Sequence, residues 1–170
     1  MGPLGSAPLP PLTAEDHLRG RDGGRLLIEY TDLECPYCAA LHVRLGPIVA
    51  GGTARLVLRH FPVRSSHPRA WAAACAAEAA GLQGRFWEMV DSLLDDQARL
   101  EDPHLWERAS RLGLELDRFE ADRRSEVVLE RVRDDFRAGV RAGVVSTPTV
   151  FMDGARHHGD SLAALITSLS

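Results

Sequence analysis

The chain has 170 residues, of which 45% are hydrophobic and 26% charged, and its formal net charge is -4. This length and balance indicate one globular domain and exclude a collagen-like or wholly disordered chain. The 20 basic residues, all arginine, are outnumbered by 24 acidic ones, so we expect no nucleic acid or anionic lipid as a partner. The longest uninterrupted apolar run, 70–77, is far too short to cross a bilayer, so we expect no direct membrane insertion.

Residues 1–15 are expected to precede the folded domain. Residues 1–6 resemble the remnant of a cleaved expression tag, and residues 7–13 contain three prolines, which is typical of an extended lead-in. No signal peptide is recognisable, so the chain as given is expected in the cytoplasm. Removal of a native leader or anchor would instead indicate a periplasmic or other extracytoplasmic protein. Residues 16–170 are predicted to form a single domain.

Two strands and an intervening helix are predicted in the first third of the domain. Residues 25–32 form a short, mostly apolar run typical of a buried strand. Pro36 suits the first turn of a helix, because its missing N–H would have no partner there. Aliphatic residues then recur at helical spacing until Gly51 and Gly52, and a second strand is predicted over 54–61.

The middle of the chain, about residues 66–143, is predicted to be an all-helical insertion. The first helix, over 70–80, contains eight alanines, which indicates close packing against its neighbours. A second helix has an apolar stripe over 86–94, and a third is expected to begin with Asp102 as its N-cap and Pro103 in its first turn. The remaining helices are expected over 114–123 and 125–142, the latter with Val128, Leu129, Val132, Phe136 and Val140 on its inner face.

Extended structure is predicted again near the C-terminus. The run 147–152 precedes Asp153-Gly154, a dipeptide that strongly indicates a hairpin between extended segments, and 155–158 would be the returning strand. A final helix is expected over 161–169. This order of elements predicts an α/β domain with a helical insertion in its middle.

The tetrapeptide Cys35-Pro36-Tyr37-Cys38 carries the clearest chemical signal. At a helix start, Cys35 meets unpaired backbone N–H groups and the positive end of the helix dipole, which should lower its pKa below about 8.5. Cys38, one turn further in, is expected to be more buried and close enough to form a disulfide with it. The alternative is half of a zinc site, but the sequence has no second C-x-x-C. We therefore expect no metal, and no cofactor besides the redox-active disulfide Cys35–Cys38.

Several segments, in the same order, resemble the DsbA-like family of thioredoxin-fold thiol–disulfide oxidoreductases. The matching stretches are 28–38, Arg59-His60-Phe61-Pro62, His67-Pro68-Arg69-Ala70, Gly84-Arg85-Phe86-Trp87 and 143–149. The combination of Cys-Pro-Tyr-Cys with a distant Thr-Pro-Thr at a strand start is specific. The closest pattern is a shorter bacterial branch, some members of which are fused to or encoded with membrane proteins. The resemblance implies a thioredoxin-like fold with a mixed sheet of four to five strands.

The resemblance also implies roles for individual residues. Pro148 is implied to be a cis proline against the active-site disulfide, and the backbone of Thr147 to pair with a bound peptide as an added strand. Together with Pro36 and Tyr37, these residues are expected to contact the substrate. Glu29 is implied to lie beneath the active site and to move protons for the inner cysteine. A half-exposed glutamate on a sheet face is the alternative.

Weaker predictions concern residues around and beyond the motif. Asp32 and Glu34 would either moderate the acidity of the first cysteine or be solvated loop charges. Cys75 is expected in the core rather than as a regulatory thiol. His157 and His158 invite a zinc site with the two cysteines, but neighbouring residues on a strand point to opposite faces, which disfavours it.

We predict a thiol–disulfide oxidoreductase that exchanges disulfides with protein substrates as a dithiol oxidase and is recycled by a redox partner protein or a small thiol. A glutathione- or thioredoxin-linked reductase is the nearest alternative, because Pro-Tyr between the cysteines also occurs in glutaredoxins. The long helical stretch between Cys38 and Pro148 exceeds what a bare glutaredoxin core needs. A non-catalytic metal-binding module is a third possibility. His60 and His67 lie in the matching segments but receive no catalytic role, and Phe86, Trp87 and Trp106 are expected in the core.

Overall fold

The computed structural model describes residues 7–170, and the predicted tag remnant at 1–6 lies outside the described residues. The strands are β1 (His17–Arg19), β2 (Arg25–Thr31), β3 (Ala54–His60), β4 (Thr149–Met152) and β5 (Ala155–His157). The helices are α1 (Pro36–Ala50), α2 (Ala70–Gly81), α3 (Phe86–Asp95), α4 (Asp102–Arg111), α5 (Leu116–Asp122), α6 (Glu126–Arg141) and α7 (Gly159–Leu169).

The strands form one mixed sheet in the order β1-β3-β2-β4-β5. At its centre, β2 runs parallel to β3, with Ile28 opposite Val57, and antiparallel to β4, with Ile28 opposite Phe151. The β4–β5 hairpin turns at Asp153-Gly154, and both residues have positive φ, as the dipeptide predicted. The edge strand β1 was not predicted, because three residues are too few to show an alternating pattern.

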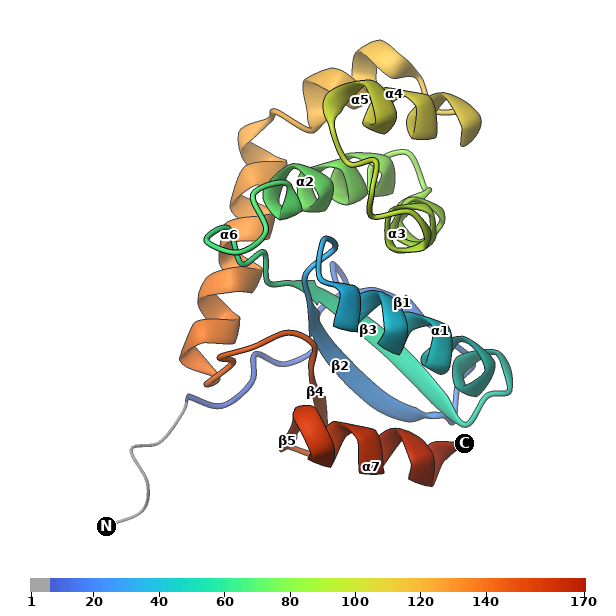
Figure 1. The fold of residues 1–170 in the computed structure, drawn as a ribbon, viewed down its shortest axis with the longest axis vertical. Helices are drawn as coiled ribbons and strands as arrows, with labels where there is room; N and C mark the ends of the chain where they lie inside the picture. The colour runs from blue at the N-terminus through green and yellow to red at the C-terminus, as the bar shows by residue number, and fades with distance from the viewer. Residues whose placement is uncertain (1–6) are drawn as a thin grey trace.

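One face of the sheet is covered by α1 and α7 (Figure 1). Leu27, Leu56 and Val150 belong to the buried cluster that these helices form with the sheet. Because side chains alternate along a strand, Glu29 lies on the same face of β2 as Leu27. The sheet therefore directs this carboxyl toward the side that carries α1.

The opposite face of the sheet is covered by α6 and the segment that follows it. Tyr30 and Phe61 lie there, with their ring centroids 6.3 Å apart in an edge-to-face arrangement. A Cβ atom on Gly139 of α6 would lie only 2.7 Å from Cδ2 of Phe61 and 2.9 Å from Cδ1 of Tyr30. The absence of a side chain at Gly139 therefore lets the helix approach the aromatic rings.

The helices α2 to α6 lie between β3 and β4, and the described chain contains no strand between those two. Figure 1 shows α2 to α5 grouped beyond one end of the sheet, with α6 running back along it. The core of this helical group continues into Leu33, Cys35 and Cys38, so the motif lies where the insertion meets the sheet. The predicted α/β fold with a mixed sheet and a helical insertion is confirmed, whereas the proposed domain boundaries remain a prediction.

Three details of the helical insertion correct the sequence analysis. The N-cap of α4 is Glu101, and Asp102 instead pairs with Arg123 at 3.1 Å. Trp106 is 42% exposed rather than in the core, and its indole N–H donates to a glutamate at 2.8 Å. Val140 is 53% exposed, because α6 turns the neighbouring Gly139 toward the sheet.

Candidate active site

The two cysteines of the motif lie at the first turn of α1. Cys35 is the N-cap, with an extended backbone (φ -77°, ψ 122°), and Pro36 follows at the start of the helix, as predicted. Both cysteines are free thiols; Cys35 is 3% exposed and Cys38 is fully buried. The backbone N–H of Cys35 donates to the carbonyl oxygen of Asp32 at 3.0 Å, which closes the loop between β2 and α1.

The surroundings of the two thiols separate their pKa values. A hydrogen bond from the Cys38 thiol lowers the pKa of Cys35 to about 5; burial opposes this shift, and the backbone N–H groups of Cys38 and Tyr37 and the Thr147 side chain add to it. Burial raises the pKa of Cys38 well above its ordinary value, and the neighbouring Cys35 and Glu29 raise it further. At neutral pH the pair therefore holds a thiolate on Cys35 and a proton on Cys38.

Glu29 is buried on the central strand β2 and is only 2% exposed, so the alternative of a half-exposed carboxylate is wrong. Burial raises the pKa of Glu29 to about 7; Thr31 and His42 oppose this rise, and the charge of Cys35 adds to it. The charge of Glu29 in turn raises the pKa of Cys38, so the two groups are electrostatic neighbours. This carboxyl can exchange a proton near neutral pH.

Asp32 connects the motif to the loop after β3. Its fully buried carboxylate accepts hydrogen bonds from the backbone N–H groups of Glu34 and Val63, both at 2.8 Å. The same carboxylate lies 2.9 Å from Nδ1 of His67. The backbone N–H of Asp32 lies 3.5 Å from Sγ of Cys38. Asp32 is therefore not a solvated loop charge, which corrects one of the two readings left open by the sequence.

Two side chains of the insertion hold the loop that carries Cys35. Nε2 of Gln97 donates to the carbonyl oxygens of Leu33 at 3.0 Å and of Cys35 at 2.9 Å. The Glu34 carboxylate accepts from the backbone N–H of Arg69 at 2.7 Å and from its Nε at 2.9 Å, so Glu34 is also paired. Gln97 was missed by the sequence analysis, because a lone glutamine in a loop belongs to no recognisable pattern.

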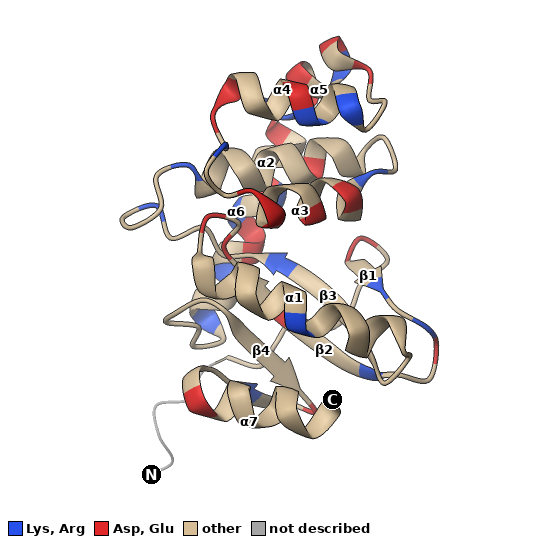
Figure 2. Ribbon diagram, turned by 45° about the vertical axis from the view of Figure 1, so that its right-hand side comes forward, with Lys and Arg blue, Asp and Glu red and all other residues tan. Residues whose placement is uncertain are grey.

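An open groove of about 400 Å³ lies between α1, α7 and the loop that precedes β4. The Thr147–Pro148 peptide bond in that loop is cis, as the resemblance implied, and the carbonyl oxygen of Thr147 lies 3.6 Å from Sγ of Cys35. Tyr37, on the wall of the groove, is 74% exposed. Each flanking helix contains only one charged residue, so the walls are largely uncharged (Figure 2).

The other cysteine and the histidine pair lie outside this arrangement. Cys75 is 3% exposed and packs with Val128 and Val132, and burial raises its pKa to about 11, which confirms the prediction of a core cysteine. His157 is half-buried on β5, whereas His158 is the exposed N-cap of α7. Within residues 7–170, no three or more His, Cys, Asp or Glu residues gather in an arrangement that could hold a metal ion.

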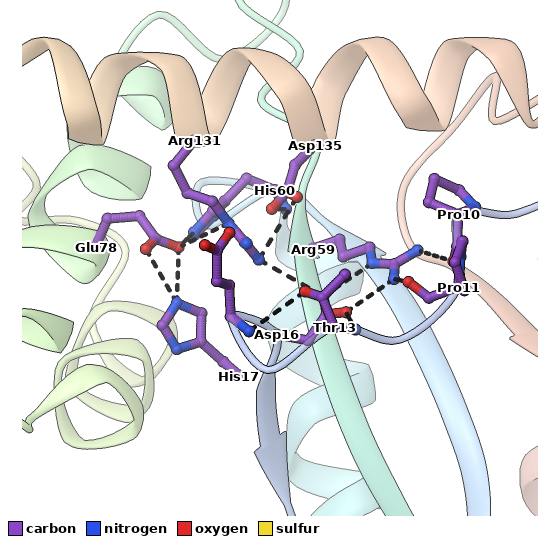
Figure 3. A network of polar contacts seen from close by, with 11 residues as sticks. Pro10, Pro11, Thr13, Asp16, His17, Arg59, His60, Glu78, Arg131 and Asp135 are labelled. Carbon is purple, nitrogen blue, oxygen red and sulfur yellow. Dashed lines mark hydrogen bonds and ion pairs between the residues drawn. The ribbon is translucent and has the colours of Figure 1, made fainter.

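A second group of polar residues, which the sequence analysis missed, is buried between the sheet, α2 and α6 (Figure 3). The Glu78 carboxylate lies 3.0 Å from Nε2 of His17 and 2.8 Å from Nε2 of His60. Arg59 pairs with Asp16 at 3.0 Å and donates to the carbonyl oxygens of two lead-in prolines. These contacts hold part of the predicted lead-in against β3.

The profile of a protein family described as Thioredoxin matches residues 14–168. Among curated proteins, Na(+)/H(+) antiporter NhaA 1 of Mycolicibacterium vanbaalenii is 41% identical over 174 residues, which cover 98% of this chain and 28% of that protein. The chain spans about a quarter of the length of the curated relatives that it matches. Within residues 7–170, no helix combines the length and apolar character needed to cross a membrane.

Solved structures share the fold at low sequence identity. A thioredoxin-like oxidoreductase from Silicibacter pomeroyi has a TM-score of 0.79 at 22% identity, over 92% of each chain. The thiol-disulfide exchange protein alpha-DsbA2 from Wolbachia pipientis has a TM-score of 0.78 at 15% identity, over 92% of this chain and 88% of that one. The family match spans the cysteine pair and the cis proline, and the chain therefore belongs to the thioredoxin family, with the fold of the DsbA-like thiol–disulfide oxidoreductases.

Proposed function

We propose that the chain exchanges disulfides with protein substrates through Cys35 and Cys38 and acts as a dithiol oxidase. The observation that carries this proposal is the division of roles between the two sulfurs. Cys35, with a pKa of about 5, is a thiolate at neutral pH, whereas the buried Cys38 keeps its proton. A stabilised outer thiolate and a protonated inner thiol are the properties expected of an exchanging and a resolving cysteine.

The oxidising reaction begins from the Cys35–Cys38 disulfide. A substrate thiolate attacks Sγ of Cys35 and forms a mixed disulfide, and Cys38 leaves with the electron pair of the broken S–S bond. Because its pKa lies far above neutrality, Cys38 takes up a proton, which Glu29, with a pKa of about 7, is proposed to deliver. A second substrate thiolate then attacks the substrate sulfur of the mixed disulfide, and Cys35 departs as a thiolate.

The low pKa of Cys35 favours oxidation of the substrate over its reduction. A leaving thiolate with a pKa of about 5 is much more stable than an ordinary cysteine thiolate, whose pKa is about 8.5, so equilibrium favours the enzyme dithiol and the substrate disulfide. Equilibration with glutathione buffers measures this balance. A potential as reducing as that of thioredoxin would support the reductase alternative. An oxidase requires an oxidising compartment, so we propose an extracytoplasmic setting for the native protein.

The groove beside the motif supports a protein as the substrate. The backbone of Thr147 lies against Cys35, with its carbonyl oxygen 3.6 Å from Sγ, and we propose that it pairs with an extended peptide. The exposed Tyr37 and the largely uncharged walls suit apolar side chains that flank a substrate cysteine. We propose that Pro36, Tyr37, Thr147 and Pro148 contact this peptide, and that the reaction needs no cofactor beyond the two sulfurs.

Cysteine substitutions test the proposed roles directly. Cys38→Ser should accumulate mixed disulfides on Cys35, because the resolving thiol is gone, whereas Cys35→Ser should lose exchange by roughly a hundredfold or more. Cys75→Ser is the matched control, since this core thiol lies outside the motif, and should retain exchange. The measurement is the rate of dithiol oxidation and of insulin disulfide reduction. Cys35→Ser with the wild-type rate would contradict the proposal.

The names of the curated relatives suggest a class of partner for this chain. Relatives named as Na(+)/H(+) antiporters contain a matching segment as about a quarter of their length. We propose that a membrane transporter, in the same polypeptide or as a separate chain, is a substrate or redox partner of this module. Mixed disulfides trapped by Cys38→Ser in native membranes test this when compared with the variant lacking both motif cysteines. A specifically trapped transporter supports the proposal, and trapping of only soluble proteins contradicts it.

A further inference from the structure

Asp32 contacts both cysteines through its backbone and a histidine through its side chain. Its N–H lies 3.5 Å from Sγ of Cys38, and its carbonyl oxygen accepts the N–H of Cys35 at 3.0 Å. Its carboxylate lies 2.9 Å from Nδ1 of His67. The side chain of Asp32 is fully buried, and that of His67 is 23% exposed. The imidazole is therefore fixed on a carboxylate whose own backbone contacts both cysteines.

A buried carboxylate in the loop that leads to a thiolate needs a compensating charge. Like charges disfavour each other, so an uncompensated Asp32 carboxylate would oppose the Cys35 thiolate. The two backbone N–H groups that donate to this carboxylate supply hydrogen bonds but no net positive charge. His67 is the titratable partner of the Asp32 carboxylate, and its protonation would make the ion pair neutral.

The groups that face His67 favour its protonated form. Burial opposes protonation, but the hydrogen bond to Asp32 and the charges of Asp32, Cys35 and Glu34 together raise the pKa of His67. Glu34 is itself paired with Arg69 at 2.9 Å. Of the three negative groups that act on His67, Asp32 and Cys35 therefore depend most on the charge of the imidazole. Electrostatic coupling is reciprocal, and a protonated His67 must therefore stabilise the Cys35 thiolate in return.

We infer that His67, oriented by Asp32, is a positioning residue that takes up a proton when the disulfide is reduced and so sustains the Cys35 thiolate. This inference rests on the proposed function. A substrate dithiol releases two electrons and two protons as it becomes a disulfide. The two electrons break the Cys35–Cys38 bond, and one of the two protons reaches Cys38. His67 takes up the other proton where its ring is still neutral, so Cys35 remains a thiolate.

A titration of the unmodified protein provides the first test. The ring protons of His67 are followed by nuclear magnetic resonance as the pH changes, in the oxidised and in the reduced protein. We expect the midpoint to lie higher in the reduced protein by about half a unit or more, because the thiolate forms only there. Equal midpoints in the two states would overturn the inference.

The second test follows the thiolate itself by its ultraviolet absorbance. Below about pH 8, only Cys35 contributes, because burial raises the pKa of Cys38 far above this range and that of Cys75 to about 11. His67→Gln should raise the midpoint of the Cys35 titration by about half a pH unit to one pH unit. At a pH below the midpoint, this shift corresponds to a loss of thiolate of about three- to tenfold. An unchanged midpoint contradicts the role of His67.

A combined substitution separates charge from structure. In the Asp32→Asn background, the ring has lost the carboxylate that holds its proton, so His67→Gln should then change the Cys35 midpoint little. An equal shift in both backgrounds would mean that His67 acts only through packing. His104→Gln, at a half-buried position on α4, is the matched control and should leave the midpoint unchanged. A wild-type protein with neither an acidic thiol nor exchange would refute the proposed function, whereas normal exchange with flat titrations refutes only the role of His67.

Discussion

Cys35 and Cys38 carry the same thiol, and their positions in the first turn of α1 make them chemically different. Cys35 receives hydrogen bonds from N–H groups that are unpaired at the start of any helix. Cys38 has turned inward, where it is fully buried near the Glu29 carboxyl. One sulfur is therefore stabilised as an anion and the other as a neutral thiol, although only two residues separate them.

Glu29→Gln should stabilise the protein above about pH 7 and leave it unchanged below about pH 4. The pKa of Glu29 rises from its ordinary value of 4.5 to about 7 in the fold. Its ionisation therefore costs stability increasingly between these values and fully above them, up to about 3 kcal/mol. Glutamine stays neutral and avoids this cost.

Urea unfolding of the reduced wild type and Glu29→Gln at about pH 4 and about pH 8 measures this difference in stability. The variant should also exchange disulfides more slowly, because Cys38 loses its proposed proton donor. A variant as stable as the wild type at both pH values would contradict the raised pKa of Glu29. So would a variant that exceeds the stability of the wild type by the same amount at both.

Small residues decide how closely the helices approach one another and the sheet. The buried positions of α2 are mostly alanines, and this helix packs against both α3 and α6. The alanine pattern predicted such close packing from the sequence. Gly139 has the same effect on α6, but its neighbours Phe61 and Tyr30 belong to other elements, and no local pattern predicted their contact.

Gly139→Ala should therefore destabilise the fold, although alanine is intrinsically the better helix former by about 1 kcal/mol. The added Cβ would overlap Phe61 and Tyr30, and overpacking of this kind costs about 1–3 kcal/mol. Val140→Ala, at the exposed next position, is the control and should change the unfolding free energy by less than about 0.5 kcal/mol. If chemical denaturation finds Gly139→Ala as stable as the wild type, the proposed close contact is wrong.

Across the whole molecule, buried charges join the insertion to the sheet. Glu78 of α2 meets His17 of β1 and His60 of β3, and Arg131 of α6 lies 4.0 Å from the same carboxylate. Four elements therefore converge on one carboxyl group (Figure 3). Because each element supplies one partner, we expect the insertion and the sheet to unfold together.

Glu78→Gln should cost about 2–4 kcal/mol near pH 7, because it removes the buried anion that His17, His60 and Arg131 share. Burial opposes the ionisation of Glu78, but the hydrogen bonds with His17 and His60 hold its pKa far below the ordinary 4.5. The ionised group thus contributes stability above that value, and the contribution is lost as the pH falls toward the lowered pKa.

Thermal or urea unfolding of Glu78→Gln and the wild type at about pH 7 and about pH 3 follows this loss. The cost of the substitution should shrink at the lower pH. The exposed Glu107, changed to glutamine, provides the control and should have little effect at either pH. A cost that is the same at both pH values would show that the charge of Glu78 does not stabilise the fold.

The sequence by itself determined the features that depend on a few neighbouring residues. The start of α1 at the cysteine motif, the hairpin at Asp153-Gly154 and the alanine-rich helix all follow from helix ends, turn conformations and apolar periodicity. The identity of the reactive pair, Cys35 and Cys38, belongs to this class as well. Among the strands of residues 7–170, β1 alone escaped prediction, because three edge residues form too short a pattern.

Only the tertiary structure decided which partners surround the reactive pair. Segments dozens of residues apart meet where Asp32 pairs with His67 and where Gln97 binds the loop that carries Cys35. The burial of Glu29 likewise depends on elements that are distant in the sequence. These contacts depend on the register of β2 with β3 and on how the insertion packs against the sheet. Neither is encoded in local periodicity, because hydrogen bonds and charges act over a few ångströms in space, whatever the distance along the chain.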